Sequence, residues 1–514
     1  MEKPVRLLVI GDRQSFYDGA FPDDVEIVHR KERVTEEDVL QSEVILVVGA
    51  LSLNEIQLLI HKAAAYRLYV LEEVDLSLQR IWTEESYKKL KESKYIQILL
   101  EEKLEEWLFQ LSVRFWTGRG GNRLGIGLID LHRQISGTVK YHGNESLSIE
   151  ARFGTELSPI LSWRINQAVN QTRRRLQIYL ECQCTENVQA ELRIMRWKGG
   201  QVAGNAAVER ISLPMQAPYE FDREQNGYLS LEIWAGGTGC LTVGNLHFRE
   251  SRDGIGEFIP GGVRHSDSMG DEFFSYLDPG DCDPPLCVYF SGYRNQEGFE
   301  GYGMMRELGV PFLLLSDPRL EGGAFYVGSR EYEENLERTI REALSKLGFT
   351  NKQLILSGLS MGTYGAMYYG ASLLPHAILA GKPLMNGGTI AAVQRTIRPG
   401  VFNTAMDVLL KMEGRTDDIG VRNLDQRMWL RFDKADFSDT KFAIAYMQQD
   451  DYDPGAYERI LEHLQRKKTC IYGKGFPGRH NDNSQGVVQW FKSQYRKILR
   501  EDYGRQNLSD VLGS

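Results

Sequence analysis

Residues 352–374 read KQLILSGLSMGTYGAMYYGASLL, and this stretch decides how the rest of the chain is interpreted. It starts as a short apolar run, KQLILSG, of the kind that forms a buried parallel strand, and it ends as MGTYGAMYYGASLL, which favours a helix. Between the two lies a G-x-S-x-G sequence with Ser360 at its centre. The motif alone is weak evidence, because 51 of the 514 residues are glycine. Its position between a strand and a helix is what indicates a nucleophile elbow.

A nucleophile elbow needs small residues on both sides of its serine. Gly358 and Gly362 meet this need, because the strand and helix backbones nearly touch at such a turn. The turn strains the serine backbone and holds its hydroxyl clear of the sheet. We therefore expect Ser360 to be a catalytic nucleophile.

Short apolar strands and helical stretches alternate on both sides of this motif. A helix is expected between an N-cap at Ser329 and a C-terminal Gly348. Further strands are expected at 286–292, 310–317 and 376–384. This alternation is typical of an α/β layer, so residues 263–514 are predicted to form an α/β-hydrolase-like catalytic domain. The 55 or so residues before the strand at 441–447 would be an insertion over the site or part of the helical layer.

A nucleophilic serine needs an imidazole base, and the imidazole needs a carboxylate that holds its tautomer. In α/β-hydrolases the acid and then the histidine follow the serine, each on a loop after a strand. His376 opens a strand candidate, and His463 lies in a charged amphipathic helix. His480 lies between a strand at 469–476 and the last helix, so it is the expected base.

The acid should follow the strand KFAIAYM at 441–447, which runs directly into QQDDYDP. Three carboxylates compete there: Asp450, Asp451 and Asp453. Acidic residues before a proline are also common in turns, so some of them serve only the loop. Asp450 is our first choice as the acid, and Asp451 is the alternative.

Acyl transfer also needs hydrogen-bond donors for the oxyanion that develops in the transition state. One donor is expected to be the backbone N–H of Met361, directly after the nucleophile. The other should come from the loop after the strand at 286–290, where the N–H of Tyr293 is the candidate. Arg294 next to it would orient a substrate or form a structural salt bridge.

Two further regions precede the catalytic one. Residues 1–115 alternate buried strands with polar helical stretches, which predicts a small Rossmann-like α/β domain. Its first strand lacks G-x-G-x-x-G, so no dinucleotide site is expected. After a glycine-rich linker at 117–127, alternating strands predict a β-sandwich over 128–250, which would suit binding of a glycan or a protein partner. A second linker is expected at 252–262.

Composition narrows the classes of function. The net charge of −9 argues against a general nucleic-acid binder. No apolar run is long enough to cross a membrane, and the N-terminus lacks the features of a signal peptide, so a cytoplasmic protein is expected. The residues match no metal-ligand spacing, and we expect neither a metal nor a tightly bound cofactor.

Five segments in this order resemble the second of the three accessory Sec system proteins, a family from bacteria that export serine-rich-repeat adhesins. They are FSGYR, LLLSDPRLEGG, LSGLSMGTYGA, QQDDYDP and GRHNDN. The resemblance implies a cytoplasmic protein that works with the other two accessory proteins and with the dedicated motor ATPase, meeting the membrane only peripherally through the export complex. It also implies an O-acetyltransferase that acts on N-acetylglucosamine of the glycosylated adhesin. The family's serine, acid and histidine fall on Ser360, Asp450 and His480. Because the acid is glutamate in some relatives, Asp451 remains an alternative candidate for the acid.

The residues by themselves support serine acyl chemistry, while transfer to a sugar comes from the resemblance. A carbohydrate esterase or another serine hydrolase would use the same three side chains, with water replacing the sugar hydroxyl. A non-catalytic scaffold of the export complex is the alternative from another class. The residues identify neither the acetyl donor nor the hydroxyl that is acetylated.

Overall fold

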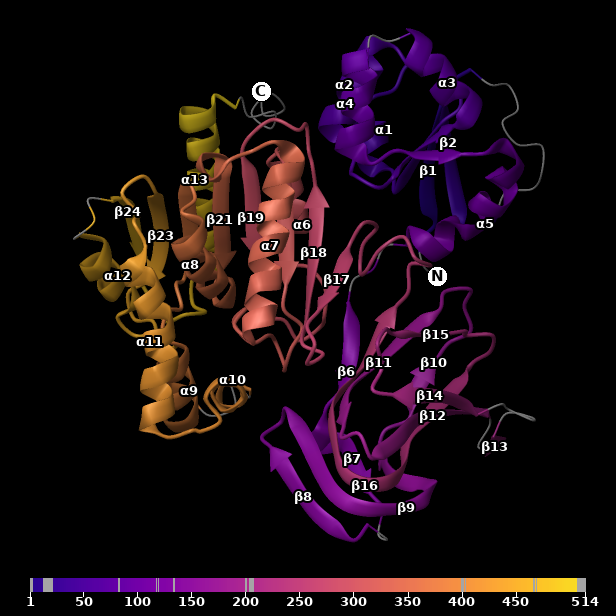
Figure 1. Cartoon of the computed structure of the whole chain (residues 1–514). Coiled ribbons are helices and arrows are strands. Elements are labelled where there is room, and N and C mark those ends of the chain that lie inside the picture. The colour runs from indigo at the N-terminus through magenta and orange to yellow at the C-terminus, as the bar shows by residue number, and fades with distance from the viewer. Residues whose placement is uncertain are drawn as a thin grey trace.

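The computed structural model describes residues 3–12, 22–81, 84–116, 118, 120–132, 135–198, 201–202, 208–398, 402, 404–465, 467 and 469–505. It has the mixed α/β character expected from the sequence, with three separate sheets along the chain (Figure 1). No helix in the described ranges is both long and apolar enough to cross a membrane.

The first sheet is parallel and has five strands in the order β2-β1-β3-β4-β5. Its strands are fully apolar at their centres, because helices cover a parallel sheet on both faces. The elements are β1 Val5–Ile10, β2 Val25–Arg30, α1 Glu36–Gln41, β3 Val44–Val47, α2 Leu53–Lys62, β4 Leu68–Leu71, α3 Glu72–Ile81, α4 Glu84–Lys94, β5 Gln97–Leu99, η1 Glu101–Lys103 and α5 Leu104–Arg114.

The second sheet is antiparallel and has eleven strands around one apolar core. Its elements are β6 Gly121–Leu124, η2 Ile126–Leu128, β7 Ile129–Leu131, β8 Gly137–His142, β9 Ser146–Trp163, β10 Gln167–Val169, β11 Leu176–Cys184, β12 Val188–Lys198, β13 Gln201–Val202, β14 Glu209–Leu213, β15 Tyr219–Phe221 and β16 Gly227–Glu250.

The eleven strands form one hydrogen-bonded network, which differs from the two separate sheets of an ordinary sandwich. The long strand β16 pairs with β12 through its first half and with β11 through its second half, and β9 accompanies it through both. The pairing of β16 with β9 shifts register around Gly237, which has φ +95°. Because bulges bend a strand and increase its twist, the sheet curls around its own core (Figure 1).

The predicted linkers are more structured than expected. Within 117–127, of which residues 117 and 119 lie outside the described ranges, β6 pairs with the end of β16. In 252–262 the buried Arg252 donates to the carbonyls of Phe258 and Arg114. Both segments are therefore packed against their neighbours through hydrogen bonds that sequence composition does not reveal.

The third sheet has eight strands in the order β17-β18-β20-β19-β21-β22-β23-β24. All neighbours from β20 to β24 are parallel, and β17 and β18 are antiparallel to their neighbours. Its strands are β17 Val263–Ser266, β18 Glu272–Asp278, β19 Leu286–Phe290, β20 Phe312–Ser316, β21 Leu354–Leu359, β22 Ala377–Gly381, β23 Lys441–Met447 and β24 Cys470–Phe476. Its helices are α6 Tyr302–Glu307, α7 Arg330–Leu347, η3 Asn351–Gln353, α8 Met361–Leu373, α9 Gly387–Thr396, α10 Ala405–Glu413, α11 Asp418–Lys434, α12 Ala456–Gln465 and α13 Ser484–Tyr503.

Local sequence explains where these helices begin and end. Ser329 caps α7 by accepting from the N–H of Tyr332, and Gly348 ends the helix with φ +71°, as expected. The segment before β23 forms α9, α10 and α11, which pack on one another at the end of the sheet (Figure 1).

Candidate active site

Ser360 stands between β21 and α8 with φ 52° and ψ −122°. A side chain on either flanking glycine would collide with backbone: a Cβ on Gly358 would lie 2.3 Å from the carbonyl carbon of Gly362. A Cβ on Gly362 would lie 2.1 Å from the carbonyl oxygen of Phe290 on the neighbouring strand. The strained turn therefore exists only because glycine occupies both positions.

Three side chains that are far apart in sequence form a continuous hydrogen-bonded series. The Oγ of Ser360 lies 2.8 Å from Nε2 of His480, and Nδ1 of His480 lies 2.8 Å from Oδ2 of Asp450. The three residues follow β21, β24 and β23, whose carboxyl ends lie at the same edge of the sheet. The His480 side chain is only 2% exposed, so protein groups rather than water hold the imidazole in place.

The three aspartates of QQDDYDP have separate partners. The carboxylate of Asp450 contacts the His480 ring, as described above. Asp451 accepts a hydrogen bond from the backbone N–H of His480 and lies 2.9 Å from a guanidinium nitrogen of Arg398. Asp453 is buried and accepts from the backbone N–H groups of Met385 and Asn386.

Burial raises the pKa of Asp453 to about 6, against the lowering effect of these hydrogen bonds. Of the three carboxylates, Asp450 is the one placed to orient the imidazole. Asp451 fixes the loop that carries His480, and Asp453 fixes the acid loop to the segment after β22.

Two residues that the sequence analysis did not single out also hold the imidazole. The ring of Tyr452 lies 4.4 Å from the His480 ring, measured between centroids. On Tyr452 lies the Arg398 guanidinium, 4.0 Å from the ring centroid. Tyr452 is in the quoted QQDDYDP segment and could have been noticed there, whereas Arg398 follows α9 and carries no local signal.

The serine opens into a pocket of about 460 Å³. One part of its wall is apolar and includes Phe325, Leu384 and Phe402, of which Phe402 comes from the segment before α10. The other part is polar and includes Asn481 and Ser484 beside His480. A lining of both kinds suits a short acyl group together with a hydroxyl-bearing partner.

Lys382 is a charged group in this pocket that the sequence analysis missed. It directly follows β22 with φ +58°, and its Nζ donates to Oγ of Ser484 at 3.1 Å. Burial lowers the pKa of its ammonium group, while the negative charges of Asp450 and Glu300 oppose that shift. Nothing in the run AGKPL distinguishes this lysine, whose place in the pocket results from the backbone turn after β22.

The loop after β19 lies beside the serine, as expected. Met361 is the first residue of α8, so its N–H has no partner one turn earlier in the helix. Within the described ranges the N–H of Tyr293 donates to no protein group, and Tyr293 and Met361 both line the pocket. The N–H of Gly292 is already used, because it donates to Oε2 of Glu300 at 2.6 Å. Both predicted oxyanion donors therefore stay predictions with free N–H groups at the pocket.

Arg294 is not among the residues that line the pocket at the serine, so its expected contact with a substrate stays a prediction. Its guanidinium donates to the carbonyl oxygen of Phe299 at 2.5 Å, within the same loop, and the pocket is lined by other residues. This geometry favours a structural role. The other histidines after the serine are occupied elsewhere: His376 contacts Asp502, and His463 contacts Asp433. No group of three or more His, Cys, Asp and Glu side chains in the described ranges could hold a metal ion.

The chain is similar to known proteins over most of its length. A family model described as the accessory Sec system GspB-transporter matches residues 12–505. An accessory Sec system protein from Staphylococcus aureus is 42% identical over 432 residues, which cover 83% of this chain and 82% of that protein. A counterpart from Streptococcus gordonii is 42% identical over 400 residues, 78% of each chain.

Among solved structures, a chain of the Glycosylation Associate Protein (Gap123) complex from Streptococcus agalactiae has a TM-score of 0.84 and 33% identity. The match covers 98% of this chain and 100% of that chain. The family model and the two relatives each span most of the chain, so the chain belongs to the accessory Sec system GspB-transporter family.

Proposed function

We propose that the protein is a serine-dependent O-acetyltransferase that acts on N-acetylglucosamine of glycosylated serine-rich-repeat adhesins, as a component of the accessory Sec export complex. The observation that carries the enzymatic part is the series Ser360–His480–Asp450, with 2.8 Å at both contacts and an imidazole enclosed by protein. Membership of the family supports the proposed role in export.

The first half of the reaction forms an acetyl-enzyme. His480 takes the hydroxyl proton of Ser360 at Nε2 while Oγ bonds to the carbonyl carbon of the acetyl donor. Asp450 stabilises the imidazolium that results, and the N–H groups of Met361 and Tyr293 would receive the oxyanion. The bond from the carbonyl carbon to the leaving group then breaks, and the leaving group departs with the proton from His480.

The second half transfers the acetyl group to a sugar. A sugar hydroxyl gives its proton to Nε2 of His480, and its oxygen bonds to the acetyl carbon. The bond to Oγ of Ser360 breaks, and the serine recovers the proton. The apolar lining residues Phe325, Leu384 and Phe402 suit the methyl group, and the polar lining residue Asn481 suits the sugar.

Hydrolysis is the nearest alternative, since a carbohydrate esterase would use water in the second half. The three side chains serve either acceptor, because the pocket at His480 that would admit a sugar hydroxyl also admits water, so the product separates the two reactions. A purely structural role as a scaffold is the other alternative, and the two roles are compatible within one chain.

The proposed partners follow from the family and from the relative solved within the Gap123 complex. We propose that this chain assembles with the other two accessory Sec proteins and works with the motor ATPase and the glycosylated adhesin. The proposed location is the cytoplasm, with peripheral contact to the membrane through the export complex.

The test combines two measurements on the wild type and on Ser360→Ala. A fluorophosphonate probe should add once to the wild type and not to the variant, as read by intact mass. With an acetyl donor and a glycosylated adhesin segment, the wild type should add acetyl groups to the glycan, and the variant should not. Acetate release without any acetylated glycan would indicate an esterase, and an unlabelled, folded wild type would leave the scaffold role.

A further inference from the structure

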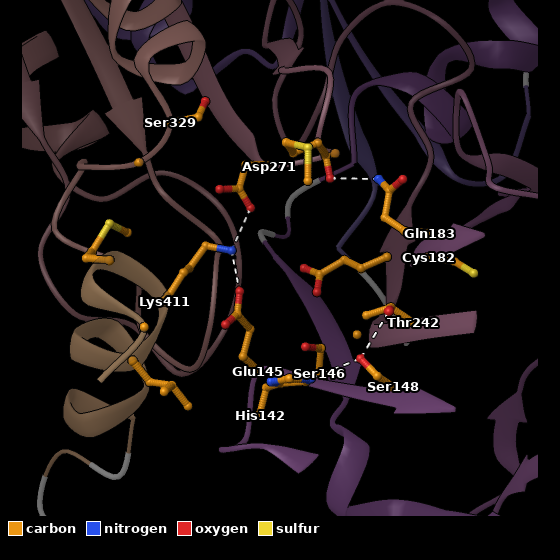
Figure 2. Close-up of a pocket in the computed structure, with 18 of the residues that line it drawn as sticks. His142, Glu145, Ser146, Ser148, Cys182, Gln183, Thr242, Asp271, Ser329 and Lys411 are labelled. Carbon is orange, nitrogen blue, oxygen red and sulfur yellow. Dashed lines mark hydrogen bonds and ion pairs between the residues drawn. The ribbon is translucent and has the colours of Figure 1, made fainter. Parts of the chain in front are cut away.

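A second cavity, larger than the one at Ser360, lies between the central sheet and the C-terminal sheet. Its volume is about 640 Å³, within the range of small-molecule sites. The turn between β8 and β9 and the strands β11 and β16 form one wall, while α10 and the loop before β18 form the other. Figure 2 shows Lys411 of α10 reaching between Glu145 and Asp271, with Ser148 and Thr242 on the wall of the central sheet. We call this cavity the interdomain cleft.

The acidic side chains of the interdomain cleft are electrically compensated. The ammonium of Lys411 pairs with Glu145 and lies 3.0 Å from Asp271, and Asp271 also lies 3.1 Å from a guanidinium nitrogen of Arg319. Glu181 lies 3.0 Å from Nε2 of His247.

His247 is charged at neutral pH, which completes this compensation. Burial disfavours its charged imidazole, but the negative charge of Glu297 and hydrogen bonds to Glu181 and Glu297 raise the pKa of His247 to about 9. Two further basic side chains belong to the described lining: Arg427 pairs with Glu333, and a ring nitrogen of His142 lies 3.0 Å from Oγ of Ser148. The cleft therefore offers no free cation to a phosphate and no bare carboxylate cluster to a metal ion.

The same walls are rich in polar groups of the kind that bind hydroxyls. Oγ of Ser148 lies 3.0 Å from a ring nitrogen of His142 and 3.1 Å from Oγ1 of Thr242. Gln183 donates through Nε2 to the carbonyl of Met269, which leaves its amide oxygen for a donor from outside. Walls of hydroxyls, amides and ion-paired carboxylates suit an uncharged ligand with many hydroxyls.

One helix connects the interdomain cleft with the pocket at Ser360. Asp407 of α10 accepts from the backbone N–H and the side-chain amide of Asn144, at 2.8 and 2.9 Å, so the central sheet holds the helix in place. Just before this helix, Thr404 donates to the carbonyl of Glu321, and Phe402 lines the pocket at the serine. A ligand in the cleft would thus contact one end of the segment that forms a wall of the catalytic pocket.

We propose that the interdomain cleft binds carbohydrate, namely sugar units of the glycosylated acceptor next to the one that receives the acyl group. This proposal rests on the proposed function for the identity of the acceptor, and on the hydroxyls, amides and ion-paired carboxylates of the cleft walls for the chemical class. The central sheet then acts as the acceptor-holding part of the enzyme, and α10 sets the position of the bound glycan relative to Ser360.

The experiment measures binding apart from catalysis. The full chain carrying Ser360→Ala is titrated with a peptide that bears N-acetylglucosamine on serine, and with the same peptide without sugar. In that background, Ser148→Trp fills the cleft and should weaken glycopeptide binding at least about tenfold, because the side chain occupies the space of the ligand. Gln183→Ala, at an exposed position, should weaken it about fivefold, the loss of one hydrogen bond. The matched control Ser136→Trp, at an exposed serine outside the cleft, should leave binding unchanged.

The control Ser136→Trp is also made in the chain with an intact Ser360, where labelling by a fluorophosphonate should stay within about twofold of the parent, since Ser136 lines neither the cleft nor the catalytic pocket. The proposal is overturned if Ser148→Trp and Gln183→Ala both bind the glycopeptide as tightly as the parent, or if the sugar-free peptide binds equally well. Gln183→Ala carries the decision if Ser148→Trp does not fold. Failure of the proposed function would look different. The Ser360→Ala chain would bind the glycopeptide, while the chain with an intact Ser360 would not be labelled by the fluorophosphonate.

Discussion

Asp450 and Asp451 are adjacent, and their substitution by asparagine should have very different effects on the serine. Asp450 is 10% exposed and holds Nδ1 of His480 at 2.8 Å. In Asp450→Asn the amide cannot stabilise the imidazolium, and its NH₂ group favours the wrong tautomer. A loss of about 10⁴-fold is expected for this change, which corresponds to about 5 kcal/mol of transition-state stabilisation.

Asp451→Asn should cost far less. It removes the ion pair with Arg398, whose two side chains are 16% and 22% exposed, while the amide oxygen can still accept from the N–H of His480. A partly exposed pair contributes about 1 kcal/mol, so we expect a loss of tenfold or less. Arg398→Ala should cost more than Asp451→Asn, because it breaks the same pair and also removes the guanidinium from the ring of Tyr452.

The assay is the second-order rate constant for formation of the fluorophosphonate adduct, followed by intact mass, with thermal unfolding as the control for folding. It isolates activation of Ser360 and needs no knowledge of the acetyl donor. Equal losses in the two asparagine variants, or a larger loss in Asp451→Asn, would refute the assignment of Asp450 as the acid.

Two substitutions and one pH dependence test contacts at the catalytic turn, at the β8–β9 turn and around His247. Gly362→Ala should abolish labelling of the serine and lower the free energy of unfolding by about 3 kcal/mol, because the added Cβ would lie 2.1 Å from a backbone oxygen. Labelling at the wild-type rate would contradict the tight turn. Asp407→Ala should leave donors of the β8–β9 turn unpaired, which lowers the free energy of unfolding by about 2 kcal/mol and with it the thermal midpoint. The exposed Asp418→Ala should leave the midpoint unchanged, and equal midpoints in the two variants would contradict the contact. The charged form of His247 stabilises the fold, so this stabilisation is complete below about pH 6.5 and is lost as the pH rises through the raised pKa of about 9. The thermal midpoint should fall over this range and less steeply in His247→Gln, and a flat profile in the wild type would contradict the buried ion pairs.

Much of the candidate site could be predicted because it depends on local signals and on a rule of topology. The small residues around Ser360 mark a strand–helix turn, and His480 and the aspartates follow later strands of the same sheet. Parallel strands align their carboxyl ends, so side chains after neighbouring strands meet at one edge. The same reasoning located Tyr293 and Met361 at the pocket, although their role as donors stays a prediction.

Other features depended on contacts between distant segments. The direction of the Arg294 side chain toward Phe299 is decided by its own loop, and the position of Lys382 by a backbone turn at the end of β22. The curled central sheet results from bulges in β16, which alternation of apolar residues does not reveal. The interdomain cleft exists only where that sheet meets α10.

The amino-acid sequence alone therefore determined the α/β class, the strand–serine–helix turn and the family to which the chain belongs, because periodicity, glycine positions and motif order are local properties. Only the tertiary structure decided that Asp450 rather than Asp451 contacts the imidazole, and that Arg398 and Tyr452 support it. The two aspartates have the same chemistry and adjacent positions. What separates them is the direction in which the loop presents each carboxylate, and that direction is fixed by the packing of β23, β24 and the segment after α9 against one another.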